Sequence, residues 1–143
     1  MRKLPVGDGE VDTGVHDVVA ILDFTDSALG YFVMDVAICI SHMSTDCPDE
    51  TQLDVGGHIL AGYFECRSLN DAELRSLKTL VCSRLCQAMV YGAHAQLQHP
   101  ENDYLEVITA KRSWPTLHRI WKMDTEELYS KWDKIVKSYS VSK

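Results

Sequence analysis

The sequence has no long apolar run and few basic residues, and each shortage excludes a class of protein. No apolar stretch approaches the roughly 20 residues that a membrane-spanning helix needs. Residues 1–16 also lack the apolar stretch of a secretory signal peptide. The 14 basic residues are outnumbered by 21 acidic ones, which argues against a basic face for nucleic acid or for an anionic membrane.

The cysteines show no CxxC spacing. There are five, an odd number. Such usage is typical of a reducing compartment, so a cytoplasmic location is expected. A length of 143 residues with 45% hydrophobic content predicts a single domain over residues 1–143, in which residues 1–14 form a loose N-terminal segment.

The order of apolar patterns predicts one short strand region followed by helices. Residues 18–22 form a β-branched apolar run that is typical of a buried strand. Apolar spacings of three and four then predict helices. They cover about residues 31–43, 55–66, 71–99, 104–110, 114–123 and 125 onward. The expected fold class is mostly α (α+β), with a short strand region followed by a helical bundle.

Several helix ends carry recognisable capping residues. Asn70 is followed three positions later by Glu73, and Asp124 by Glu127, both patterns of a capping box. Pro115 falls in the first turn of its helix, where proline is tolerated. The helix over 31–43 is apolar almost all round, so it is expected to be buried on several sides and to enclose Asp35, whose carboxylate then needs donors.

Two aspartates directly after the predicted strand are the first candidates for chemistry. Asp23 ends the apolar run and Asp26 follows in a polar turn. Carboxylate oxygens on a rigid support suit a hard cation such as Mg²⁺. A simple turn explains the same two residues, because aspartate often forms turns of this kind.

The wider spacing supports the metal-binding interpretation through a family resemblance. The segment 21–37, with Asp23-Phe24, Gly30 and Asp35-Val36-Ala37, resembles the signature of the aminoglycoside phosphotransferase and choline kinase-like superfamily. Among the members of this superfamily, the chain resembles the hydroxylysine kinases, because short segments further along the sequence also match them. The resemblance covers about residues 15–140. The matching segments are residues 55–62, 80–87, 99–105 and 109–111.

The resemblance implies the C-terminal lobe of a protein-kinase-like fold. It further implies phosphoryl transfer from GTP to the hydroxyl of 5-hydroxy-L-lysine with Mg²⁺ in the cytoplasm. Asp23 matches the metal-binding aspartate, Asp26 would lie next to the metal, and Asp35 matches an acidic residue that braces the catalytic loop. Thr25 departs from the family pattern, which commonly has glycine there.

The same resemblance predicts that essential parts lie outside this chain. The His-Gly-Asp catalytic loop would precede Asp23, yet residues 1–22 do not contain it, and the nucleotide-binding N-terminal lobe would lie further upstream. No catalytic residue is therefore assigned, and the chain alone is expected to be inactive. A non-catalytic helical interaction or regulatory module derived from the lobe is the alternative.

Other chemistry-bearing residues have simpler interpretations. Cys82 and Cys86, with His94 and His99, would suit zinc only if all four converged, and core packing is the favoured role of the cysteines. Tryptophans at positions 114, 121 and 132 are predicted to be core anchors. Gly56 and Gly57 would permit either substrate approach or close helix packing. Arg84 is expected on a solvated helix face, with a substrate carboxylate as the alternative partner.

Overall fold

The structure is a computed structural model, and it describes residues 19–20, 27–102 and 112–141. These ranges form five helices and contain no strand. The helices are α1 (Phe32–Asp46), α2 (Val55–Cys66), α3 (Asp71–Gln98), α5 (Trp114–Lys122) and α6 (Thr125–Val141). The mostly α fold class is confirmed for this part of the chain.

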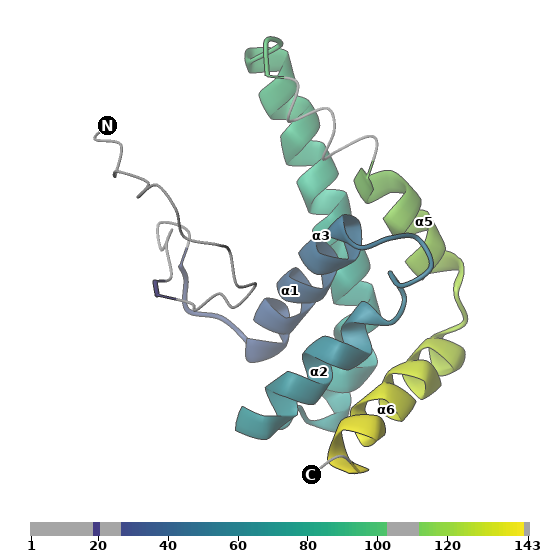
Figure 1. The fold of residues 1–143 in the computed structure, drawn as a ribbon. Coiled ribbons are helices and arrows are strands. Elements are labelled where there is room, and N and C mark those ends of the chain that lie inside the picture. Colours follow the sequence, from purple (N-terminus) through teal and green to yellow (C-terminus); the bar gives the residue numbers. More distant parts are fainter. Residues whose placement is uncertain (1–18, 21–26, 103–111, 142–143) are drawn as a thin grey trace, which may run out of the picture.

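The longest helix, α3, supports the others. Helices α1 and α5 pack against α3, while α2 contacts both α1 and α6 (Figure 1). The C-terminal half of α3 projects beyond the other helices in the same view. Apolar side chains on this half are therefore exposed, among them Val90, Tyr91 and Leu97.

The predicted capping residues set the helix ends. The Asn70 side chain accepts hydrogen bonds from the backbone N–H groups of Ala72 and Glu73, at 2.9 and 3.0 Å. The Glu73 carboxylate in turn accepts from the Asn70 backbone N–H at 2.8 Å, which completes the capping box. Asp124 accepts from the Glu127 backbone N–H at 3.0 Å. Pro115 stands in the first turn of α5, as predicted.

The core lies where α1, α2, α5 and α6 meet the N-terminal half of α3. Leu77, Val81 and Leu85 form a fully buried stripe along α3, at spacings of four. Leu128 and Trp132 from α6 join the same cluster. The Trp132 indole also donates from Nε1 to the Leu53 carbonyl oxygen at 2.8 Å, so its one polar atom is satisfied.

Two expected elements fall mostly or wholly outside the described residues, and one of them needs correction where it is described. The predicted strand over 18–22 falls mostly outside them, as does the predicted helix over 104–110. Val19 and Ala20 have no regular structure, and Val19 is exposed rather than buried. Strand geometry needs a partner for its backbone groups, and no strand in the described ranges provides one.

Helix α1 is buried on one face only, which differs from the expectation. Its buried side chains are Val33, Val36, Ala37, Ile40, Ser41 and Ser44. The remaining apolar side chains of α1 are exposed because no described element covers that side. None of the helices in the described ranges is long and apolar enough to cross a membrane.

Candidate functional site

The two predicted metal ligands fall just before the part of the chain that the structure describes in this region. Asp23 and Asp26 lie outside the described residues, so their geometry is not assigned. Within the described ranges, no group of three or more His, Cys, Asp or Glu side chains could hold a metal ion. The metal-binding role of both residues remains a prediction.

Asp35, the predicted brace, is exposed in the first turn of α1. Tyr31 is the N-cap residue of this helix and makes no side-chain capping hydrogen bond. A carboxylate in the first turn is favourable near the positive end of the helix dipole. The enclosed Asp35 that the sequence predicted is not found, because the surrounding side of α1 is uncovered; its bracing role stays a prediction.

Around Asp35 lies a surface that we call the open face of α1. It consists of Tyr31, Met34, Asp35, Ile38, Cys39 and His42, all of them exposed. At one edge the Arg67 guanidinium stacks on the Phe32 ring, with its carbon 3.7 Å from the ring centroid. The cation shields part of that apolar ring from water, and no other cation–ring contact is found on this face among the described residues.

The open face continues onto α3 through a contact between His42 and Arg84. The Arg84 Nη2 atom lies 3.3 Å from Nε2 of His42, and Nη1 donates to the Gln87 side chain at 3.0 Å. Burial and then the Arg84 charge lower the pKa of His42, while Asp46 acts in the opposite direction. The neutral ring is favoured, and it accepts a hydrogen bond from Arg84.

Arg84 is thus not the solvated residue that the sequence suggested. Its side chain is half-buried, and its Nε atom is buried without a hydrogen-bond partner. No acidic side chain in the described ranges forms an ion pair with it. A buried N–H without an acceptor costs free energy of folding.

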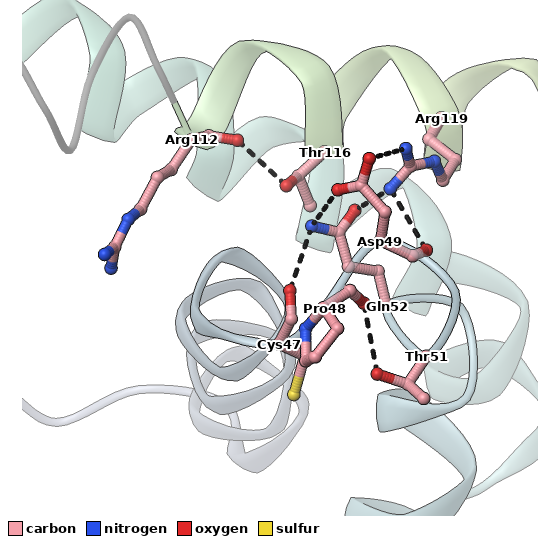
Figure 2. A network of polar contacts seen from close by, with 8 residues as sticks. All are labelled: Cys47, Pro48, Asp49, Thr51, Gln52, Arg112, Thr116 and Arg119. Carbon is pink, nitrogen blue, oxygen red and sulfur yellow. Dashed lines mark hydrogen bonds and ion pairs between the residues drawn. The ribbon is translucent and has the colours of Figure 1, made fainter.

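A polar network fixes the loop between α1 and α2 against α5. Figure 2 shows Arg119 pointing toward Asp49 and Gln52 of that loop. The Arg119 guanidinium donates to the Asp49 carboxylate at 2.7 Å and to the Gln52 side-chain oxygen. Gln52 donates onward to the Cys47 carbonyl oxygen at 3.3 Å. The arrangement stiffens the loop.

Sequence reasoning did not find this network. Asp49 and Arg119 are 70 positions apart, so no local pattern connects them. A second link lies beside it, because Arg112, just before α5, pairs with Asp46, the last residue of α1, at 2.8 Å. The only sequence signal was the presence of charged residues near a proline-containing loop, which is too common to single out a contact.

An apolar groove of about 500 Å³ is lined by residues of α3 and α5, beside the contact between these two helices. Trp114, His118 and Trp121 line one side, at spacings of four and three, and Cys82 and Cys86 line the other. Trp114 and Trp121 are 59% and 66% exposed, so the prediction that they are core anchors is wrong, whereas Trp132 is buried as predicted. The short α5 buries Thr116 and Ile120 instead, and both tryptophans lie on its other side.

The predicted core packing is confirmed for Cys82 but is wrong for Cys86, which is exposed. Cys82 belongs to the hydrophobic core, and burial raises the pKa of its thiol, which disfavours the thiolate that zinc binds. Gly56 and Gly57 lie against Trp132 and Ile135 of α6, where a side chain would collide. Close helix packing therefore explains the two glycines.

Comparison with known proteins finds relatives of this chain among the hydroxylysine kinases. It is 39% identical to hydroxylysine kinase of Bos taurus over 125 residues, which is 87% of this chain and 33% of that protein. It is 40% identical to hydroxylysine kinase of Mus musculus over 126 residues, 88% of this chain and 33% of that protein. The hydroxylysine kinase of Danio rerio is 38% identical over 117 residues.

The chain spans about one third of the length of the curated relatives it matches. This share agrees with the expectation that it corresponds to only a part of such an enzyme. No protein-family model matches the chain, and no solved structure matches it.

Proposed function

This chain is homologous to a segment of the hydroxylysine kinases, and we propose that it forms the helical C-terminal part of a phosphotransferase lobe. The observation that carries the proposal is the identity of 38–40% to three vertebrate enzymes over at least 82% of the chain. The reaction proposed for the whole enzyme is phosphoryl transfer from GTP to the hydroxyl of 5-hydroxy-L-lysine in the cytoplasm. The odd number of cysteines and the lack of a CxxC pair support that location.

Asp23 is the proposed metal ligand, with Asp26 next to the metal. Mg²⁺ is held in many such enzymes by one or two carboxylates together with substrate phosphates, and it neutralises charge on the transferred group. The described residues supply no further ligand cluster. Further coordination would come from substrate phosphates and from other protein residues.

Asp35 is proposed to hold the catalytic loop in place. Its exposed position in the first turn of α1 supports the proposal, since the carboxylate is accessible to backbone donors from another part of the enzyme. Hydrogen bonds from backbone N–H groups to a carboxylate are charge-assisted and strong. This helix would then position the loop rather than take part in the chemistry.

The chain alone is proposed to be inactive. Phosphoryl transfer depends on groups that position the phosphates and the attacking hydroxyl together. The residues of this chain include no His-Gly-Asp catalytic loop. Where catalytic groups act together, removing any one of them abolishes nearly all of the rate enhancement.

The test compares this chain with a fusion protein that adds the unmatched portion of the mouse hydroxylysine kinase. Both are incubated with Mg²⁺, labelled GTP and 5-hydroxylysine, and phosphohydroxylysine is measured. Product is expected from the fusion protein only. Asp23→Asn should lower the fusion protein's rate about 100-fold or more, while Asp71→Asn, an exposed aspartate at the start of α3, should leave it unchanged.

Two results would contradict the proposal. Product from this chain alone, abolished by Asp23→Asn, would refute the claim that the missing parts are required. A folded but inactive fusion protein would favour the alternative, a non-catalytic helical module.

A further inference from the structure

The C-terminal half of α3 projects beyond the other helices (Figure 1), and we propose that it binds the same half of a second copy of this chain. The two halves run antiparallel and form a symmetric dimer. Four features support this contact: the charge of the projecting half, the spacing of its apolar side chains, the groove beside it and the exposed area.

The projecting half of α3 carries no charged side chain. From Leu85 to Pro100 the sequence has no Asp, Glu, Lys or Arg, although these residues make up 24% of the whole chain. Leu85 is the one buried residue of this stretch. An exposed helix of this kind lacks the charged face that normally meets water, which indicates a contact with protein.

Four residues on one side of this helix form a stripe that we call the α3 seam: Cys86, Val90, Ala93 and Leu97. All four are exposed, Val90 and Leu97 to 67% and 83%. Their spacings of four, three and four are those of the a and d positions through which two helices pack on each other. The spacing therefore indicates another helix as the occupant of the seam.

The α3 seam is complementary to itself when the second copy lies antiparallel. Cys86 then faces Leu97 and Val90 faces Ala93, because both pairs of residues have the same midpoint along the helix. Each pair places a large side chain against a small one, which favours close packing. A parallel pair would instead place Leu97 against Leu97 and bring the like ends of two helix dipoles together.

The apolar groove lined by α3 and α5 continues the seam, since Cys86 belongs to both. Trp114 and Trp121 of α5 line this groove and are 59% and 66% exposed. In the antiparallel arrangement, the Leu97 side chain of the second copy lies beside Cys86 at this groove. The groove and the seam thus form one surface that a second copy covers.

The exposed area is sufficient for a dimer. A large aromatic side chain can bury about 150–250 Å², so the exposed parts of the two tryptophans provide roughly 200–300 Å². With the seam and the polar residues beside it, each copy offers roughly 500–700 Å², so the pair reaches the total of about 1,000 Å² that a specific interface needs.

The charge of the chain favours the seam over other exposed apolar surfaces as the place where a second copy binds. Each copy has a formal net charge of −7, so two copies repel each other unless the contact itself is free of acidic groups. The open face of α1 has the Asp35 carboxylate in its middle, whereas the α3 seam contains no charged residue. The second copy is therefore assigned to the seam.

Sedimentation velocity of this chain over a range of concentrations tests the dimer. Val90→Glu adds a charge at the centre of the seam and should raise the dissociation constant of the dimer about 100-fold or more. Ile38→Glu, at an exposed apolar position on the open face of α1, is the matched control and should leave the constant unchanged. Circular dichroism checks that both variants keep their helices.

Two results of this measurement would overturn the proposal. One is a wild-type chain that stays monomeric up to its solubility limit. The other is a dimer that Ile38→Glu dissociates and Val90→Glu does not, because the contact would then lie on α1.

Leu97→Cys tests the antiparallel register. Under mild oxidation the introduced thiol should form a disulfide with Cys86 of the second copy, detected by peptide-resolved mass spectrometry. The two Cys86 residues themselves lie about 16 Å apart along the helices in this register, too far for a disulfide. Gln98→Cys, about 100° away around the helix, should react with Cys86 about tenfold more slowly or less. A disulfide between two introduced thiols, in place of the bond to Cys86, would overturn the antiparallel arrangement.

The dimer can be tested separately from the proposed function, because sedimentation needs no substrate. The fusion protein with the mouse portion should also form a dimer that Val90→Glu dissociates. A monomeric fusion protein would overturn the proposal, since the rest of the enzyme would then cover the seam. A dimeric fusion protein that forms no phosphohydroxylysine would retain the dimer and reject the kinase activity.

Discussion

The backbone of Gly57 in α2 lies directly against Ile135 in α6. A Cβ atom at Gly57 would stand 2.7 Å from the Cβ of Ile135, closer than such atoms approach in proteins. Gly56 has the same relation to the Trp132 ring. The two glycines therefore set how closely α2 and α6 pack.

Gly57→Ala should destabilise the chain, although alanine is the better helix former. The added methyl group forces α6 away and costs about 1–3 kcal/mol of unfolding free energy. Gly62→Ala, in the same helix with open space around its Cα, should instead raise stability by up to about 1 kcal/mol. Urea unfolding of the two variants measures both changes in the free energy of unfolding. Equal changes would show that Gly57 does not lie against Ile135.

Gln52→Ala should loosen the loop between α1 and α2. The Gln52 side chain is buried, accepts from Arg119 and donates to the Cys47 carbonyl oxygen, so the variant loses two part-buried hydrogen bonds, one of them to a charged group. The expected cost is about 1–3 kcal/mol. Gln98→Ala, at the exposed end of α3, should change thermal stability by less than about 0.5 kcal/mol. A variant at Gln52 as stable as the one at Gln98 would argue against the network.

The Asp49–Arg119 pair should make stability depend on pH in acid. The hydrogen bond and charge of Arg119 hold the pKa of Asp49 below its ordinary value. The pair therefore contributes fully above the unfolded pKa of about 3.9, and its contribution is lost as pH falls through the lowered pKa. The melting temperatures of the wild type and Asp49→Asn should differ at neutral pH and converge in acid. A difference in melting temperature that persists in strong acid would show that the charge of Asp49 is not its cause.

His42 should titrate below an ordinary histidine. Burial and the neighbouring Arg84 lower the pKa of its ring, so the folded chain binds the proton less readily than the unfolded chain. The contribution of the neutral ring to the free energy of unfolding is fully present above the unfolded pKa of about 6.5. It is lost as the pH falls from there through the lower pKa of His42 in the folded chain. Histidine ring signals in NMR measure the titration directly.

Substituting Arg84 separates the two causes. Arg84→Met should raise the pKa of His42 only part of the way, because burial is the larger cause. Arg75→Met, an exposed position on the same helix, should leave it unchanged. Full recovery of the ordinary pKa in Arg84→Met would show that the charge alone is responsible.

Asp35→Asn should have a small effect in this chain. The carboxylate is exposed in the first turn of α1, so the variant loses only its favourable interaction with the helix dipole, about 0.3–1 kcal/mol. In the fusion protein the loss should be larger if Asp35 accepts backbone hydrogen bonds there. Calorimetry of both proteins compares the two costs. A large loss in this chain alone would mean that Asp35 already has partners here.

The sequence by itself determined where α3 and α5 begin. The capping box of Asn70 and Glu73 acts within four residues, and Pro115 acts on its own turn, so both operate before any tertiary contact forms. The sequence also determined the relation to the hydroxylysine kinases, because shared residues along most of the chain carry it. These are local or one-dimensional properties.

Only the tertiary structure decided which side of each helix is covered. Trp132 is buried while Trp114 and Trp121 are exposed, and the open face of α1 is apolar without being buried. Asp49 meets Arg119 across 70 positions, and Gly57 meets Ile135 in another helix. Burial of an apolar side chain is favourable in free energy. Whether a given side chain is buried depends on which neighbouring element the fold places against it.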